Sequence, residues 1–233
     1  MSLVIKKIGG SLLKSDEDFK KIAAYLAEAY HQNPRMIVVV SALHGETDRL
    51  IHEAEMLSPT PCHARELLLS LGEQKSCALL GLALEPLGIP YTIFSGTHVG
   101  LSKGRNGTYE VNKTSYEAAL QNGIAIVSGF HVVDGNFNLI NLGRGGSDFT
   151  AILLTQALKA NACELIKDVP GVFNTHPEWG PLGQFFKNLS FDQMLQLSEQ
   201  GVPVVQKEAL LFAQRHNVSF RVADLSGKGT IIG

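Results

Sequence analysis

Residues 36–48 read Met36-Ile37-Val38-Val39-Val40-Ser41-Ala42-Leu43-His44-Gly45-Glu46-Thr47-Asp48. The first five are an unbroken apolar run, which is typical of a strand buried on both faces of a parallel sheet. From Ser41 onward the run gives way to glycine and polar side chains. Ligands of open α/β sheets collect outside the carboxyl ends of the strands. This stretch therefore predicts an α/β fold and marks one place where a ligand would bind.

The rest of the chain alternates between short apolar runs and amphipathic stretches. We expect a helix from Ser15 to about Asn33-Pro34 and a hairpin turn at Asp134-Gly135. Further strands are expected at 4–5, 91–94, 124–127, 165–166 and 220–222, the last of which would close the sheet. Further helices are expected at 63–87, 148–159, after the capping box that starts at Ser190, and at 207–216.

Alternating strands and helices predict an αβα sandwich around an open, mainly parallel central sheet. We interpret residues 1–233 as a single domain with two lobes. The N-terminal lobe would cover about 1–162 and hold the substrate, and the C-terminal lobe would cover about 163–233 and hold the nucleotide.

Composition excludes several classes of partner. The net charge is −2, and no basic stripe or polybasic tail is present, so neither nucleic acid nor a membrane surface is an expected partner. The longest apolar runs are too short to cross a bilayer. Three cysteines without a CxxC pair indicate reduced thiols and a cytoplasmic protein, and eight scattered histidines indicate no metal site.

Three glycine-containing turns carry polar side chains where strands should end. They are Lys7–Ser11, Ser41–Asp48 and Gly143–Asp148. Glycine allows backbone N–H groups to approach an anion, and a following helix N-terminus adds partial positive charge. One such turn alone is more simply a tight turn, but three favour an anion-binding site. No Walker A or GxGxxG pattern is present, which excludes a P-loop and a Rossmann phosphate site.

The same turns resemble those of aspartokinases, in the amino-acid kinase superfamily. The matching segments, in order along residues 3–232, are Lys7-Ile8-Gly9-Gly10-Ser11, Val38–Leu43 with Thr47-Asp48, Leu71-Gly72-Glu73-Gln74, Leu142-Gly143-Arg144-Gly145-Gly146-Ser147-Asp148, and Asp168–Phe173. The segment 142–148 matches the LGRGGSD loop of that family without a change. The resemblance implies transfer of the γ-phosphoryl group of ATP to the β-carboxylate of aspartate, with Mg²⁺ held mainly through the nucleotide phosphates.

The resemblance also implies a set of site residues. The catalytic pair would be Lys7 and Asp148, and the phosphate-binding residues would be Gly9, Gly10 and Ser11. The substrate-binding residues would be Ser41, Thr47, Glu73, Arg144, Gly146 and Ser147. The nucleotide-binding residues would be Lys167, Asp168, Gly171, Phe173 and Lys207.

Elementary chemistry is compatible with these roles. The acceptor carboxylate is ionised at pH 7, so catalysis needs positioning and charge neutralisation more than a base. Arg144 can grip a carboxylate with two parallel hydrogen bonds, and Glu73 can accept an ammonium group. Glu73 could equally be an exposed acid at a helix start, and Asp148 could be a helix N-cap. Strand alternation sends Lys6 and Lys7 to opposite faces, and we expect Lys6 to be solvated.

The C-terminal third departs from the family pattern. Lys167-Asp168 replaces a Thr-Asp pair, Phe173 replaces a tyrosine, and His176-Pro177-Glu178 replaces Asp-Pro-Arg. Pro203 stands where the family has a phosphate-contacting lysine. We expect Lys167, and less so Lys207, to supply the missing charge, with weaker binding of ATP as the result. Trp179 is interpreted as a packing residue.

Two other functions remain open at this point. One is a kinase for another small carboxylate, phosphonate or carbamate. The other is a non-catalytic amino-acid-binding or partner subunit with a degraded ATP site. Aspartokinases usually continue into regulatory domains, whereas this sequence ends at Gly233. We therefore expect an unregulated stand-alone form, with a homodimer left open.

Overall fold

The computed structural model describes residues 2–174, 183–202 and 204–233. Its strands are β1 (Val4–Ile8), β2 (Met36–Val40), β3 (Tyr91–Phe94), β4 (Leu101–Lys103), β5 (Tyr109–Val111), β6 (Ile124–Ser128), β7 (His131–Val133), β8 (Leu139–Asn141), β9 (Ala162–Ile166), β10 (Val172–Phe173), β11 (Phe185–Phe186), β12 (Asn188–Leu189), β13 (Phe220–Ala223) and β14 (Gly229–Ile232). Its α-helices are α1 (Asp16–Gln32), α2 (Glu46–Leu57), α3 (His63–Leu84), α4 (Lys113–Leu120), α5 (Gly146–Leu158), α6 (Phe191–Glu199) and α7 (Lys207–His216). Short 3₁₀ helices are η1 (Gly10–Leu12), η2 (Glu85–Leu87) and η3 (Gly96–His98).

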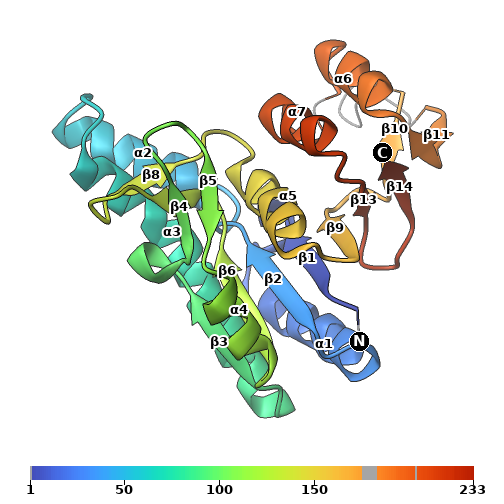
Figure 1. Ribbon diagram of the computed structural model, residues 1–233, viewed down its shortest axis with the longest axis horizontal. Coiled ribbons are helices and arrows are strands. Elements are labelled where there is room, and N and C mark those ends of the chain that lie inside the picture. The colour runs from blue at the N-terminus through green and yellow to red at the C-terminus, as the bar shows by residue number, and fades with distance from the viewer. Residues whose placement is uncertain (1, 175–182, 203) are drawn as a thin grey trace.

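The central sheet has eight strands in the order β12-β14-β13-β9-β1-β2-β6-β3. All neighbouring pairs are parallel except β13 and β14, which confirms the mainly parallel sheet. Residues 220–222 do not close the sheet, contrary to expectation, because β14 turns back beside β13 and β12 adds the edge. The strand β9 lies between β1 and β13, so one sheet runs through both proposed lobes (Figure 1).

Strand alternation sorts the core into two layers. Along β2, Ile37 and Val39 face a cluster that includes residues of α4 and α5, whereas Val38 and Val40 face a cluster that includes residues of α1 and α3. All five residues of β2 are buried, which explains why the sequence has no polar position there. This layering confirms the αβα sandwich (Figure 1).

Local sequence signals account for several element ends. The Ser190 side chain and Gln193 form the predicted capping box at the start of α6. The predicted hairpin at Asp134-Gly135 joins β7 and β8, and Asp134 accepts backbone N–H bonds from Asn136 and Asn138. The helix α2 was not predicted, and in the small sheet β5-β4-β7-β8 the strands β4 and β5 were not predicted either. The strands of that sheet are three residues long, so they leave almost no periodic signal.

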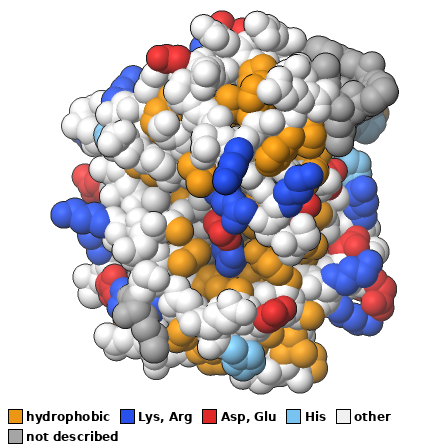
Figure 2. Space-filling view, turned by 90° about the vertical axis from the view of Figure 1, so that its right-hand side faces the viewer, with side chains coloured by type: hydrophobic (Ala, Val, Ile, Leu, Met, Phe, Trp, Pro, Cys, Tyr) orange, Lys and Arg blue, Asp and Glu red, His pale blue; other side chains and the backbone are white. Residues whose placement is uncertain are grey.

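The helical stretch 63–87 is long and apolar enough to cross a membrane by length and composition alone. Half of it is buried inside the protein, and Cys77, Leu80 and Leu84 belong to the core layer shared with α1. Core packing therefore explains its apolar character. The face shown in Figure 2 carries Lys and Arg side chains interspersed with Asp and Glu. No single sign of charge dominates that face.

Candidate active site

The three glycine turns meet around one cavity at the carboxyl ends of the strands. The cavity has a volume of about 550 Å³, which is within the usual range for a small-molecule site. Nine of the predicted site residues line it: Lys7, Gly10, Ser11, Ser41, Thr47, Glu73, Arg144, Gly146 and Ser147. The structure therefore brings the predicted phosphate-binding turn and the predicted substrate-binding residues into one place.

Glycine is required in these turns for two different reasons. Gly143 and Gly145 have φ angles of 77° and 73°, and Gly145 begins α5 from this left-handed conformation. Gly10 is not among the residues with positive φ. There, a Cβ atom would lie 2.7 Å from the carbonyl oxygen of Ala42, so only glycine allows the β1 turn to pack against the β2 turn.

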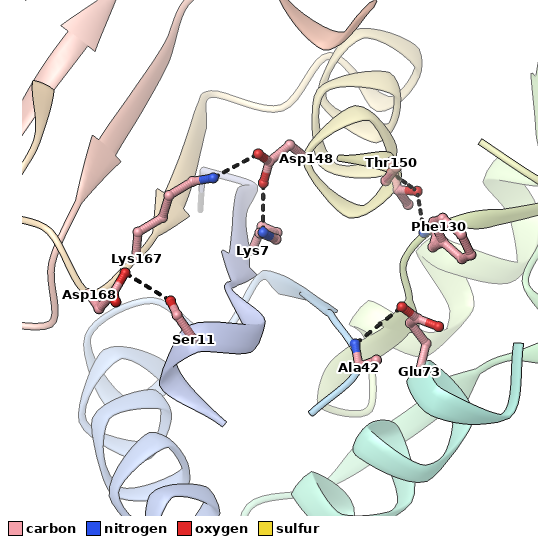
Figure 3. Close-up of polar contacts among 10 residues, drawn as sticks. Lys7, Ser11, Ala42, Glu73, Phe130, Asp148, Thr150, Lys167 and Asp168 are labelled. Carbon is pink, nitrogen blue, oxygen red and sulfur yellow. Dashed lines mark hydrogen bonds and ion pairs between the residues drawn. The ribbon is translucent and has the colours of Figure 1, made fainter. Parts of the chain in front are cut away.

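Asp148 joins two lysines at the centre of the site. Lys7 Nζ lies 2.7 Å from Asp148 Oδ1, and Lys167 Nζ lies 2.8 Å from Asp148 Oδ2 (Figure 3). Lys7 comes from β1, Asp148 from the first turn of α5, and Lys167 directly follows β9. Asp148 is therefore not the N-cap of α5, because Gly145 occupies that position and the carboxylate points to the lysines.

The charges of this group act on the pKa values of Asp148 and Lys7. Burial alone would raise the pKa of Asp148, but the positive charges of Lys167 and Lys7 overcome that effect and lower it. Burial lowers the pKa of Lys7, the charge of Asp148 opposes that shift, and the charge of Lys167 adds to it. One carboxylate thus aligns two ammonium groups at the strand ends, and the three charges together leave an excess of one positive charge.

Lys6 occupies the opposite face of β1, as strand alternation predicts, but it is not solvated. Its side chain is 11% exposed and forms an ion pair with Glu164 of β9. Its Nζ also donates to the hydroxyl of Tyr25 in α1, at 3.0 Å. The expectation of a solvated lysine was wrong because α1 covers this end of the sheet and supplies a polar partner.

Glu73 is buried in α3 and lines the cavity, so it is not an exposed acid at a helix start. Its Oε1 accepts a hydrogen bond from the backbone N–H of Ala42 at 3.2 Å (Figure 3). Its Oε2 is buried and has no hydrogen-bond partner among the described residues. Burial raises the pKa of Glu73 to about 7, while the Ala42 N–H and the charge of Lys7 work in the other direction. This carboxylate is poised to accept a cationic ligand group.

Arg144 lies in the turn between β8 and α5 and lines the same cavity as Glu73, as we predicted. It is exposed, and no ion pair joins its guanidinium to an acid within the described residues. The turn is held by a hydrogen bond of 3.1 Å from Gly143 N to Asn141 Oδ1. A free guanidinium and an unpartnered carboxylate oxygen in one cavity match the two ends of an α-amino acid.

The predicted nucleotide-side residues divide into two groups. Lys167 and Asp168 contact site residues without lining the cavity. Lys167 pairs with Asp148, and Ser11 Oγ donates to Asp168 Oδ1 at 2.8 Å (Figure 3). Gly171 packs against Thr230, Phe173 packs edge-on against Phe185, and neither lines the cavity.

Lys207 lies on the surface, 3.0 Å from Glu199, and is also absent from the cavity lining. Gly9 adjoins the site through its own N–H, which donates to the carbonyl of Ile166 at 2.9 Å. The predictions for His176, Glu178, Trp179 and Pro203 fall outside the described residues.

The lining residues that were missed from the sequence include Arg65, Phe130, Asn141 and Gln206. Phe130 follows Ser128-Gly129 at the end of β6 and has a φ of 76°. It lies in a fourth turn at the carboxyl end of a strand, and this position could have identified it from the sequence. The other three come from a helix start, a short strand and a helix flank. No motif connects them to the cavity.

Among the described residues, no three His, Cys, Asp or Glu side chains gather to hold a metal ion. Asp148 is occupied by two lysines and Asp168 by Ser11. The carboxylates present thus do not form a protein cage for a cation.

Comparison with known proteins gives the family. The family model "Amino acid kinase family" matches residues 2–224. An aspartokinase of Pseudomonas aeruginosa is 36% identical over all of this chain, which spans 58% of that protein. The chain thus spans a little over half the length of this curated relative.

Solved structures agree with that match. An aspartate kinase from Synechocystis superposes with a TM-score of 0.87 at 29% identity, covering 99% of this chain and 39% of that one. Aspartokinase III of E. coli, solved with aspartate and ADP, has a TM-score of 0.78 at 21% identity, covering 99% and 64%. The sequence match and the shared fold lead to one conclusion: this chain belongs to the amino acid kinase family.

Proposed function

We propose that the protein transfers the γ-phosphoryl group of ATP to the β-carboxylate of aspartate. A carboxylate oxygen forms a bond to the γ-phosphorus, the bond from that phosphorus to the β–γ bridging oxygen breaks, and ADP leaves with the electron pair. The product is an acyl phosphate. The observation that carries this proposal is the single cavity that presents Arg144, the unpartnered Oε2 of Glu73 and Lys7 together.

Charged residues of the site would contact ligand groups of opposite charge. Arg144 would bind the α-carboxylate, and Glu73 would accept the α-ammonium group, which leaves the side-chain carboxylate free to react. Lys7 and Lys167, aligned by Asp148, would offset the negative charge shared by the acceptor and the transferred phosphoryl group. The backbone N–H groups of Gly10 and Ser11 would contact the phosphates at the start of η1, since the N–H of Gly9 is already bonded to Ile166.

The altered nucleotide side still offers cationic charge. Lys167 stands at the end of β9, where it would meet the phosphates together with Lys7. Mg²⁺ usually keeps few protein carboxylates and several phosphate oxygens. In this proposal the ion would arrive with the nucleotide. The named aspartokinase relatives and the E. coli neighbour solved with aspartate and ADP support the choice of substrates.

Release of ADP with a set of acceptors tests this proposal. Aspartate should support turnover. Asparagine lacks the reacting carboxylate and should not, and succinate lacks the ammonium group that Glu73 needs and should be at least tenfold poorer. ATP consumption with succinate equal to that with aspartate would mean that the ammonium end is not recognised. Binding of aspartate without any release of ADP would favour a non-catalytic amino-acid-binding protein.

A further inference from the structure

A second arginine, Arg65, lines the same cavity as Arg144, and it has no role in the proposed function so far. It lies in the first turn of α3, and its side chain is 17% exposed. Its Nη2 lies 3.3 Å from Glu55 Oε1 in α2. Its Nη1 is buried and has no hydrogen-bond partner among the described residues. A buried donor without an acceptor is costly, so a ligand oxygen at this nitrogen would be strongly favoured.

A chain of hydrogen bonds links the two arginines. Glu66, the neighbour of Arg65, accepts bonds from the backbone N–H of Asn141 at 3.0 Å and from its Nδ2 at 2.7 Å. Asn141 Oδ1 in turn accepts from Gly143 N at 3.1 Å, directly before Arg144. The start of α3 and the Arg144 turn are thereby fixed to each other, and both arginines line the cavity.

The chemistry of a carboxylate suits such a pair. Its two oxygens offer about four acceptor positions, whereas one guanidinium fork fills only two. Lys7, the other cation in the lining, is already held by Asp148. The ligand group for Arg65 is therefore an oxygen anion in the cavity that Arg144 also lines.

We propose that Arg65 binds the α-carboxylate of the amino-acid substrate together with Arg144. This inference rests on the proposed function and sharpens it. Because two arginines would bind the α-carboxylate, the site should prefer amino acids with a free α-carboxylate over their α-amides. The exposed ion pair with Glu55 uses Nη2, which leaves Nη1 for the substrate.

Calorimetry with aspartate and with isoasparagine, its α-amide, tests the proposal. Arg65→Ala should raise the Kd for aspartate at least tenfold and should reduce the preference for aspartate over isoasparagine. Arg65→Lys keeps a cation opposite Glu55 but loses the fork, and it should still raise the Kd several-fold. This second variant keeps the test valid if Arg65→Ala does not fold.

Two variants serve as matched controls. Glu55→Ala removes the ion pair and keeps the guanidinium, so aspartate binding should change less than threefold. Arg49→Ala removes an exposed arginine of α2 that pairs with Glu46 and Glu53, and it should also be silent.

Unchanged affinity in Arg65→Ala would overturn the proposal, and so would an equal loss in Glu55→Ala, which would indicate a purely structural role. Absence of aspartate binding to the unaltered protein would instead overturn the proposed function itself.

Discussion

The acceptor side of the site and the segment after β9 differ in how many of their motif residues contact the site. On the acceptor side, residues of β1 and α3, of the turns that follow β1 and β2, and of the segment Gly143–Ser147 all line one cavity. Among the described motif residues after β9, Lys167 contacts Asp148 and Asp168 contacts Ser11. The motif residues farther along, Gly171 and Phe173, make contacts within the C-terminal part of the chain.

This difference teaches that distance from a strand end decides whether a motif residue reaches the ligand. Lys167 is the first residue after β9, and a strand paired with β1 must deliver it beside Lys7. Phe173 lies in a separate two-stranded sheet, where burial against Phe185 already explains an aromatic side chain. A motif match thus carries more weight at the carboxyl end of a central strand than in a peripheral hairpin.

The largest expected effect on the acceptor side is the loss of turnover in Lys7→Ala. Removing one preorganised charge from the reacting groups should lower turnover by about 100- to 1,000-fold, measured as ADP release. The control is Lys6→Ala, which removes the neighbouring lysine on the other face.

Lys6→Ala should leave turnover per folded molecule within about threefold, but it should destabilise the protein by about 1–3 kcal/mol because Glu164 and Tyr25 lose their partner. Equal losses of turnover in the two variants would mean that the faces of β1 are wrongly assigned.

Arg144→Ala probes the acceptor side. Loss of a bidentate charge-assisted contact should weaken aspartate binding by about 1.5–3 kcal/mol, roughly ten- to a hundredfold, in calorimetry. ATP binding should not change. Arg215→Ala, on α7, is a control that should leave both affinities intact. A loss of ATP affinity that matches the loss for aspartate would place Arg144 on the nucleotide side.

Lys167→Ala probes the one nucleotide-side lysine that reaches the site. It should weaken binding of ATP with Mg²⁺ about tenfold, since one of two aligned charges is lost. Lys207→Ala removes a lysine that is paired with Glu199 on the surface, and ATP affinity should stay the same. If both variants bind ATP as the unaltered protein does, the charge for the phosphates comes from elsewhere.

The smallest expected effect is a pH dependence set by Glu73. Because its pKa is raised to about 7, the carboxyl is mostly neutral at pH 6 and mostly charged at pH 8. Aspartate affinity should therefore increase up to about tenfold over that interval, and the increase should be absent in Glu73→Gln. In the unliganded protein, the raised pKa contributes stability at low pH that is lost as pH rises from about 4.5 to about 7. Affinity that falls as pH rises would contradict the assignment of Glu73 to the ammonium group.

Much of the fold could be predicted from the spacing of apolar residues and from residues typical of turns and helix caps. The apolar run of β2, the capping box at Ser190 and the Asp134-Gly135 turn each specify their local structure by short-range rules. The burial of Lys6 did not follow, because it depends on Tyr25 and Glu164, which are distant in sequence. Arg65 and Asn141 were missed for the same reason: their place in the cavity results from packing of α3 against β8, and no local pattern encodes that contact.

The central claim is that this site makes an acyl phosphate on aspartate. Hydroxylamine traps such a product as a hydroxamate, which forms a coloured complex with ferric iron, and the trapping reaction contains the protein with added ATP, Mg²⁺ and aspartate. We predict hydroxamate that depends on all three additions, that is abolished in Lys7→Ala and that is strongly reduced in Arg144→Ala at low aspartate. Protein that binds both ligands in calorimetry yet yields no hydroxamate would contradict the account.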